Sequence, residues 1–223
     1  MRKGFMAKVA VATTVPLAAS GLAYAAGTFH EVKPHSYDPA HTFLVTSGWI
    51  NGVGCPTNAK TSSGTYTDPA CDTASSTKDD HNQGLILSKV GPTSNNAAAQ
   101  VDLKDVAGTH VTELGYDIRK HGGAASPTGS HCGGGAPRFN VTYADDPSPV
   151  FLGCNAADSE TAGDGWTRLR WDLDGSRTVK SIQIVFDEGT DASGGTDQFG
   201  LAVLDNIDVD GVLVGHGDNG DAA

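Results

Sequence analysis

Short runs in which hydrophobic and polar residues alternate follow one another along most of this chain. Because the side chains of a strand point alternately to its two faces, a period of two predicts strands with one buried face. Glycine, proline, asparagine or aspartate bounds each run, as is typical of strand ends. The predicted strands are residues 42–50, 84–90, 98–103, 110–119, 138–143, 150–154, 166–173, 179–187 and 201–214, the last being open to interpretation as a pair that turns at 210–211.

Several of these runs separate into an apolar and a polar face, and no run keeps a helical period over ten residues. Strands that bury one face are typical of antiparallel sheets. Their regular spacing, with no linker of pure proline or serine composition, favours one domain. The fold prediction is therefore all-β, an antiparallel β-sandwich of jelly-roll type with long disulfide-stapled loops at 52–82 and 122–135.

The first 25 residues have the order of a secretory signal peptide. Arg2, Lys3 and Lys8 precede the short apolar run 9–23, and Ala23-Tyr24-Ala25 matches the small-x-small cleavage pattern. The alternative is a buried hydrophobic strand or helix. We expect a signal peptide over 1–25, an extended segment over 26–40, one sandwich domain over 41–217 and a flexible tail over 218–223, in a secreted protein with no membrane span.

The charge balance excludes two classes of partner. The full chain has a formal net charge of −11, and removal of the three basic residues of the leader leaves 12 basic against 26 acidic residues, or −14. Nucleic acids and anionic lipids are bound through clustered Lys and Arg, so neither is an expected partner. The acidity is explained either by solubility or salt adaptation, or by binding of hard cations such as calcium.

The four cysteines are an even count in an exported chain, which favours disulfides. The sequential pairing, Cys55–Cys71 and Cys132–Cys154, closes two short loops and is the favoured one of three connectivities. A metal site with nearby histidines is the alternative, and the chain has no Cys-x-x-Cys spacing to support it. His131 beside Cys132 suggests a Cys–His nucleophile only if that thiol is free.

The runs at 110–119, 166–173 and 179–187, together with the closing Leu204-Asp205-Asn206-Ile207-Asp208-Val209, resemble galactose-binding-like and carbohydrate-binding modules. The segment around Pro137-Arg138-Phe139 is similar to that of uncharacterised secreted bacterial proteins. The resemblance covers about 84–215 and implies a jelly-roll architecture more than an activity.

Enzyme motifs are mostly missing: the chain has no nucleophile elbow, zincin motif, phosphate loop or dinucleotide fingerprint. Two carboxylates would suffice for a glycosidase, and the sequence does not single out a pair. For calcium, acidic residues gather in a Gly/Ser/Thr-rich loop after a predicted strand, and Asp205 falls among apolar residues of the last strand. The candidate calcium ligands are Asp187, Glu188, Asp191, Asp197 and Asp205.

A polar ligand such as a sugar calls for a flat aromatic ring beside hydrogen-bonding side chains. The candidate ligand-binding residues with this character are Asp117, Arg138, Asn140, Trp166, Arg168 and Arg170, whereas Trp49 and Trp171 are expected in the core. The alternative is that Arg168 and Arg170 pair with acidic residues across the sheet.

Together these patterns favour a secreted, non-catalytic binding or cell-surface module for carbohydrate, with calcium as a possible structural ion and no catalytic residue assigned. An extracellular hydrolase acting on polysaccharide and a structural envelope or matrix protein are the alternatives. The oligomeric state is not predicted. Two close carboxylates in a cleft would favour the hydrolase, and exposed aromatic rings without such a pair would favour the binding module.

Overall fold

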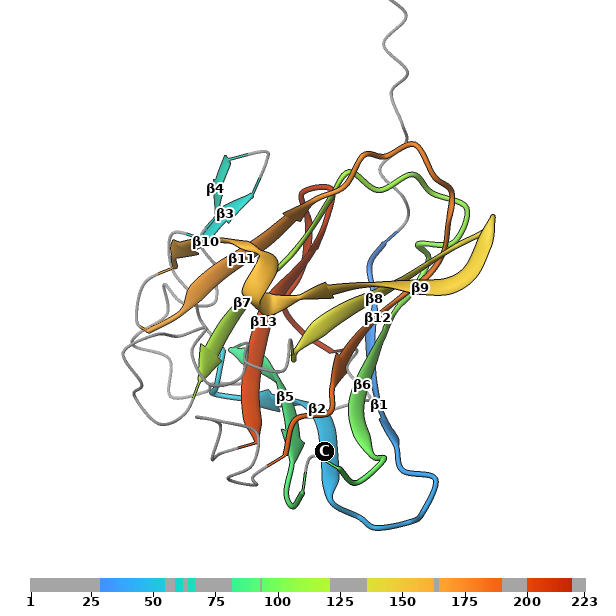
Figure 1. Ribbon diagram of the computed structural model, residues 1–223. Helices are drawn as coiled ribbons and strands as arrows, with labels where there is room; N and C mark the ends of the chain where they lie inside the picture. Colours follow the sequence, from blue (N-terminus) through green and yellow to red (C-terminus); the bar gives the residue numbers. More distant parts are fainter. Residues whose placement is uncertain are drawn as a thin grey trace, which may run out of the picture.

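The protein is a β-sandwich of two antiparallel sheets in a computed structural model (Figure 1). The structure describes residues 29–54, 59–61, 64–66, 82–92, 94–120, 136–162, 165–189 and 200–217. One sheet has five strands in the order β1-β6-β12-β8-β9. The other has the order β10-β11-β7-β13-β5-β2, with β14 paired to β13. A separate pair, β3 and β4, completes the described strands.

The strands of the five-stranded sheet are β1 (Val32–Tyr37), β6 (Ala98–Leu103), β8 (Arg138–Tyr143), β9 (Asp146–Gly153) and β12 (Val179–Phe186). Those of the other sheet are β2 (Val45–Asn51), β5 (Gln83–Lys89), β7 (Glu113–Lys120), β10 (Asp158–Thr161), β11 (Thr167–Asp172), β13 (Leu201–Val209) and β14 (Val212–Val214). The small pair consists of β3 (Ala59–Thr61) and β4 (Gly64–Tyr66), and one 3₁₀ turn, η3 (Cys154–Ala156), follows β9.

The prediction of an all-β antiparallel sandwich is confirmed. The two strands β6 and β8 have the predicted bounds, and the last predicted run is a pair, β13 and β14, that turns at Asp210 and Gly211. Both turn residues have positive φ, 52° and 84°, and Asp210 is of a residue type that enters this region more readily than most.

One expectation is corrected at the N-terminal side of the domain. The sequence placed 26–40 outside the sandwich, but Val32–Tyr37 pairs with β6 along its whole length as the edge strand β1. Pro34 lies within this strand, and an edge position tolerates proline because one side of the strand needs no partner. The core accordingly includes Val32, whose carbonyl accepts a hydrogen bond from Nε1 of Trp49 at 3.1 Å.

The core lies between the inner faces of the two sheets. Tyr116 of β7, Phe139 of β8 and Trp171 of β11 meet there with ring centroids 5.2–5.4 Å apart. The predicted core positions Trp49 and Trp171 are both buried. Because Phe139 and Val141 point inward, their neighbours Arg138 and Asn140 point to the outer face of the five-stranded sheet.

Candidate functional site

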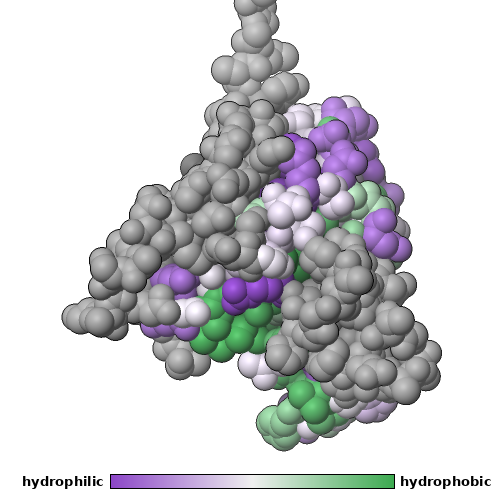
Figure 2. Space-filling model, turned by 90° about the vertical axis from the view of Figure 1, so that its left-hand side faces the viewer, coloured by the Kyte–Doolittle hydropathy of each residue, from purple (hydrophilic) through white to green (hydrophobic). Residues whose placement is uncertain are grey.

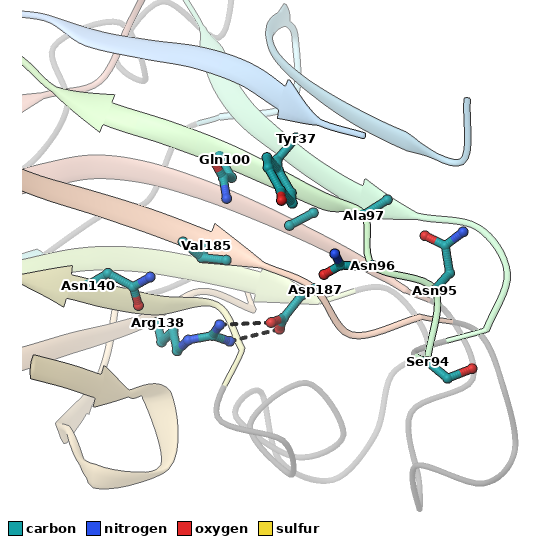
Figure 3. Close-up of a pocket in the computed structure, with 11 residues that line it drawn as sticks. Tyr37, Ser94, Asn95, Asn96, Ala97, Gln100, Arg138, Asn140, Val185 and Asp187 are labelled. Atoms are coloured by element: carbon teal, nitrogen blue, oxygen red, sulfur yellow. Dashed lines mark hydrogen bonds and ion pairs between the residues drawn. The ribbon is translucent and has the colours of Figure 1, made fainter. Parts of the chain in front are cut away.

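A cleft of about 300 Å³ lies on the outer face of the five-stranded sheet, where β1, β6, β12 and β8 run side by side (Figure 3). The register explains which residues share it: Gln100 of β6 is opposite Val185 of β12, which is opposite Arg138 of β8. Tyr37 is paired with Ala98 at the β1 side. The segment 94–97 that leads into β6 closes one end.

Arg138 and Asp187, which both line this cleft, form an ion pair with two hydrogen bonds. Arg138 donates from Nη1 and Nη2 to the two carboxylate oxygens of Asp187, each at 2.7 Å. Such fork-to-fork geometry fixes both side chains and is stronger than a single hydrogen bond. The Asp187 carboxylate is therefore engaged by Arg138 and neutralised by it.

Aromatic rings flank the cleft on two sides. Tyr37 is 46% exposed at the β1 edge, and Phe151 of β9 is 61% exposed beside β8. Phe151 is opposite Asn140 in the register and so lies on the same outer face. The Arg138 guanidinium carbon is 5.6 Å from its ring centroid, which is within the range of a cation–π contact.

Asn140 is the residue that most directly indicates a ligand. Its Oδ1 is buried and has no hydrogen-bond partner, although the residue lines the cleft. The neighbouring amide of Gln183 donates instead to Asp102, at 2.8 Å. Oδ1 of Asn95, at the closed end of the cleft, is likewise buried without a hydrogen-bond partner. Leaving a buried acceptor without a donor costs about 1–3 kcal/mol, so both oxygens favour a ligand or water that donates hydrogen bonds.

Lys89 connects two segments that line the cleft, one at Asn95 and the other at Asp187. It is buried on β5 of the opposite sheet, and its ammonium donates to the carbonyl oxygens of Asn95 and, at 3.0 Å, of Asp187. Charge-assisted hydrogen bonds to carbonyls are among the few ways to stabilise a lysine in a core. The side chain thus fixes the 94–97 segment relative to the end of β12.

The structure does not bring the six predicted ligand-binding residues together. Arg138 and Asn140 lie at the cleft, whereas Asp117, Trp166, Arg168 and Arg170 belong to the seven-stranded sheet or its margin. The ring of Trp166 is only 1% exposed and lies 4.7 Å from the Arg119 guanidinium carbon. The expected exposed indole is therefore a buried one, and this ring is not placed to stack on a sugar.

Arg168 and Arg170 follow the alternative that the sequence allowed, pairing with acidic neighbours. Arg170 lies 3.8 Å from Glu113 and 3.5 Å from Glu160. Arg168 is opposite Asp117 in the register, but it is buried rather than solvated. Its role is therefore internal to the sandwich.

A buried polar network surrounds Arg168. Its guanidinium donates to Asp208 and, at 2.8 Å, to the carbonyl of Asn206, and it lies 3.8 Å from Asp117. Nδ2 of Asn206 donates to Asp117 at 3.0 Å. Burial raises the pKa of Asp117 to about 6 and that of Asp208 to about 7, and the positive charge of Arg168 opposes both shifts.

The predicted calcium ligands are also separated. Asp187 lies at the cleft with Arg138, and Glu188 beside it is buried, whereas Asp205 is buried on β13 and accepts a hydrogen bond from N–H of Asn206. Asp191 and Asp197 lie outside the described residues. Within the described part of the chain, no three His, Cys, Asp or Glu side chains are grouped to hold a metal ion.

Two further predictions concern cysteines and membranes. Cys154 is buried and is disulfide-bonded. Cys55, Cys71 and Cys132 lie outside the described residues, so the pairing stays a prediction.

None of the helices among the described residues has the length and apolar character needed to cross a bilayer.

Comparisons with known proteins yield little at the level of sequence. No family model matches the chain, and no curated protein matches it. Among solved structures, the family 11 carbohydrate-binding module of the cellulosomal cellulase Lic26A-Cel5E of Clostridium thermocellum is similar at 11% identity and a TM-score of 0.31, over 85% of this chain and 90% of that one. A second match is the family 11 carbohydrate-binding module from Clostridium thermocellum in complex with a β-1,3-1,4-mixed-linked tetrasaccharide, at 14% identity and a TM-score of 0.32, over 82% and 98%.

Proposed function

We propose that this protein is a secreted, non-catalytic module that binds carbohydrate in the cleft between β1, β6, β12 and β8. The observation that carries the proposal is the buried, unpartnered Oδ1 of Asn140 in a cleft flanked by the exposed rings of Tyr37 and Phe151. Sugars combine hydroxyl donors, which such an oxygen needs, with flat apolar ring faces that pack on aromatic side chains. A purely apolar ligand would leave the Asn140 oxygen without a donor.

The carboxylates of the cleft support binding rather than hydrolysis. Glycoside hydrolysis needs two carboxyl groups about 5–10 Å apart, one of them with a raised pKa. Asp187 is the one carboxylate among the described residues that line the cleft, and Arg138 holds it in a bidentate ion pair. Among the described residues, the two carboxyl groups with raised pKa, Asp117 and Asp208, are buried on the other sheet.

The test is binding of the mature protein to a glycan array, followed by titration calorimetry with the best soluble polysaccharide. We expect Asn140→Ala to weaken binding at least tenfold, because it removes the buried acceptor. Tyr37→Ala and Phe151→Ala should weaken binding by severalfold each, because each removes an aromatic surface on which a sugar ring can pack. Phe43→Ala is the matched control, since Phe43 is 87% exposed and does not line the cleft. An array without binding, or equal loss in the Phe43 variant, would overturn the proposal.

Export and the disulfides belong to the same proposal. We expect the protein from culture medium to begin near Ala26 and to carry the sequential disulfides Cys55–Cys71 and Cys132–Cys154. Mass spectrometry of the intact protein gives the first, and peptide mapping without reduction gives the second. A full-length mass in the medium, or a Cys71–Cys132 peptide, would contradict them.

Calcium remains a proposal for the loop that follows Asp187. If Asp191 and Asp197 bind the ion with backbone oxygens, removal of calcium by a chelator will lower the melting temperature, because an ion that binds only the folded state stabilises it. An unchanged melting temperature would exclude a structural role for calcium in this protein.

A further inference from the structure

A second hollow, of about 220 Å³, lies on the same outer face as the cleft. It is formed by the end of β6, the segment 104–107 and the beginning of β12. Its polar side chains are those of Asp102, Lys104, Asp105, Lys180 and Ser181. The cleft lies at the opposite ends of the same two strands, at Ala98 and Gln100 of β6 and at Val185 of β12.

The register places the two hollows directly beside each other. Asn140 of the cleft is opposite Gln183, and Gln183 is opposite Asp102 of the second hollow. Neighbouring strands are about 4.8 Å apart, so only the single position Gln183, about 10 Å in all, separates the two linings across the sheet. Along β12, the outward residues Val185 and Ser181 are about 13 Å apart at a strand rise of about 3.3 Å. A single sugar ring is too short to contact both, and a chain of several rings is long enough.

Each hollow contains an ion pair. The cleft pairs Arg138 with Asp187 at 2.7 Å, and the second hollow pairs Lys104 with Asp102 at 3.0 Å. A ligand with its own negative charge would have to compete with these carboxylates and would meet a protein of net charge −11. Exposed Lys180 and Ser181 add donors at one end, and the Asn140 oxygen adds an acceptor at the other.

We propose that the cleft and the second hollow are the two ends of one site, which binds a linear, neutral oligosaccharide lying along β6 and β12. This inference rests on the proposed function and specifies its ligand: a stretch of several sugar units within an unbranched chain, rather than a single terminal sugar. The Asn140 end accepts hydrogen bonds from ligand hydroxyls, and the Lys180 end donates to ligand oxygens. Binding energy then accumulates with chain length until both ends are filled.

The experiment measures affinity by calorimetry for dimer-to-hexamer ladders of β-linked glucose, xylose and mannose. For the wild type we expect affinity to rise at least tenfold between the dimer and the longest member of the ladder that binds. Lys180→Ala should remove most of that rise. Asn140→Ala should weaken binding at every length. Lys33→Ala is the matched control, because Lys33 is exposed on β1 opposite Asp102 and outside both hollows.

The outcomes separate this inference from the proposed function. Affinity that does not depend on length, or Lys180→Ala and Lys33→Ala variants that behave alike on every ladder, would overturn the two-ended site. If Asn140→Ala still weakened binding in that case, the carbohydrate-binding cleft would stand. No binding to any ladder would overturn both. A charged ladder, such as oligogalacturonate, that bound more tightly than the neutral ones would contradict the neutral ligand.

Discussion

At the scale of single residues, Arg168 shows how a buried charge is accommodated. Its guanidinium meets Asp208, Asp117 and the carbonyl of Asn206, whereas Oδ1 of Asp117 and Oδ1 of Asn206 are buried without a hydrogen-bond partner. Pairing of this kind offsets the loss of hydration but does not by itself make the protein more stable than apolar packing would. Removing one partner leaves the others charged and buried.

We therefore expect Arg168→Met to be strongly destabilising. The substitution keeps an unbranched apolar stem and removes the charge that faces Asp117 and Asp208, and breaking a buried pair in this way costs about 3–5 kcal/mol. The control is Arg177→Met, because Arg177 pairs with exposed Asp145 at 2.8 Å and such surface pairs contribute at most about 1 kcal/mol. Urea denaturation of both variants measures the difference. Equal losses would show that the buried network has no special role.

At the scale of elements, most strands could be predicted because half-buried strands leave a period of two in the sequence. Two of the missed strands, β10 and β1, share a reason. The four residues of β10, Asp158–Thr161, include no hydrophobic side chain, and β1 carries Pro34 and polar outward residues. Neither strand has the alternation that marks the others. Missing β1 also meant missing Tyr37, which flanks the cleft.

The candidate site could be predicted only in part, for a related reason. Alternation correctly placed Arg138 and Asn140 on an outer face, because Phe139 and Val141 between them are buried. It could not show that Trp166 and Arg168 belong to the other sheet, since sheet membership depends on pairing between strands distant in the sequence. Both faces of β11 are mostly buried, so its polar residues are not surface residues. Figure 2 views the molecule from the side on which β10 and β11 lie, and the described residues there include both hydrophilic and hydrophobic ones.

The β13–β14 turn gives a prediction at this scale. Oδ1 of Asp210 accepts hydrogen bonds from N–H and O–H of Thr112 and from N–H of Glu113, all within 2.9 Å, and so joins the turn to the start of β7. Asp210→Ala should lower the free energy of unfolding by about 1–3 kcal/mol through loss of these bonds and of a residue suited to positive φ. Asp210→Asn keeps an acceptor and tolerates this backbone, so it should lose clearly less. Thermal denaturation of the two variants measures the difference. Equal destabilisation by Asp210→Ala and Asp210→Asn would show that the hydrogen bonds to the Asp210 side chain contribute nothing to stability.

At the scale of the whole molecule, acidic groups whose pKa values are shifted in opposite directions set the dependence of stability on pH. Hydrogen bonds from Gln183 and Lys104 lower the pKa of Asp102 in spite of its partial burial. Stability from this group is present above its unfolded pKa and is lost as the pH falls through the folded value. Asp117 and Asp208 act in the other direction, because burial raises their pKa values to about 6 and about 7. A raised carboxyl pKa means that the folded state binds the proton more tightly, so stability is present below the unfolded pKa and is lost as the pH rises through the folded value.

The protein should consequently be more stable at pH 5 than at pH 8. Between the unfolded pKa of about 4 and the folded values near 6 and 7, each of the two groups can lower the free energy of unfolding by up to about 1.4 kcal/mol per pH unit. The side chain that Asp208→Asn introduces resembles the protonated aspartic acid. This variant should therefore show a smaller decrease in the free energy of unfolding between pH 5 and pH 8. Asp158→Asn is the control for the loss of one negative charge from an acidic protein, since Asp158 is exposed on β10. Urea denaturation from pH 4 to pH 9 measures all three proteins. A wild-type curve that rises toward pH 8, or Asp158→Asn and Asp208→Asn curves of the same slope, would show that the buried network does not control the pH dependence.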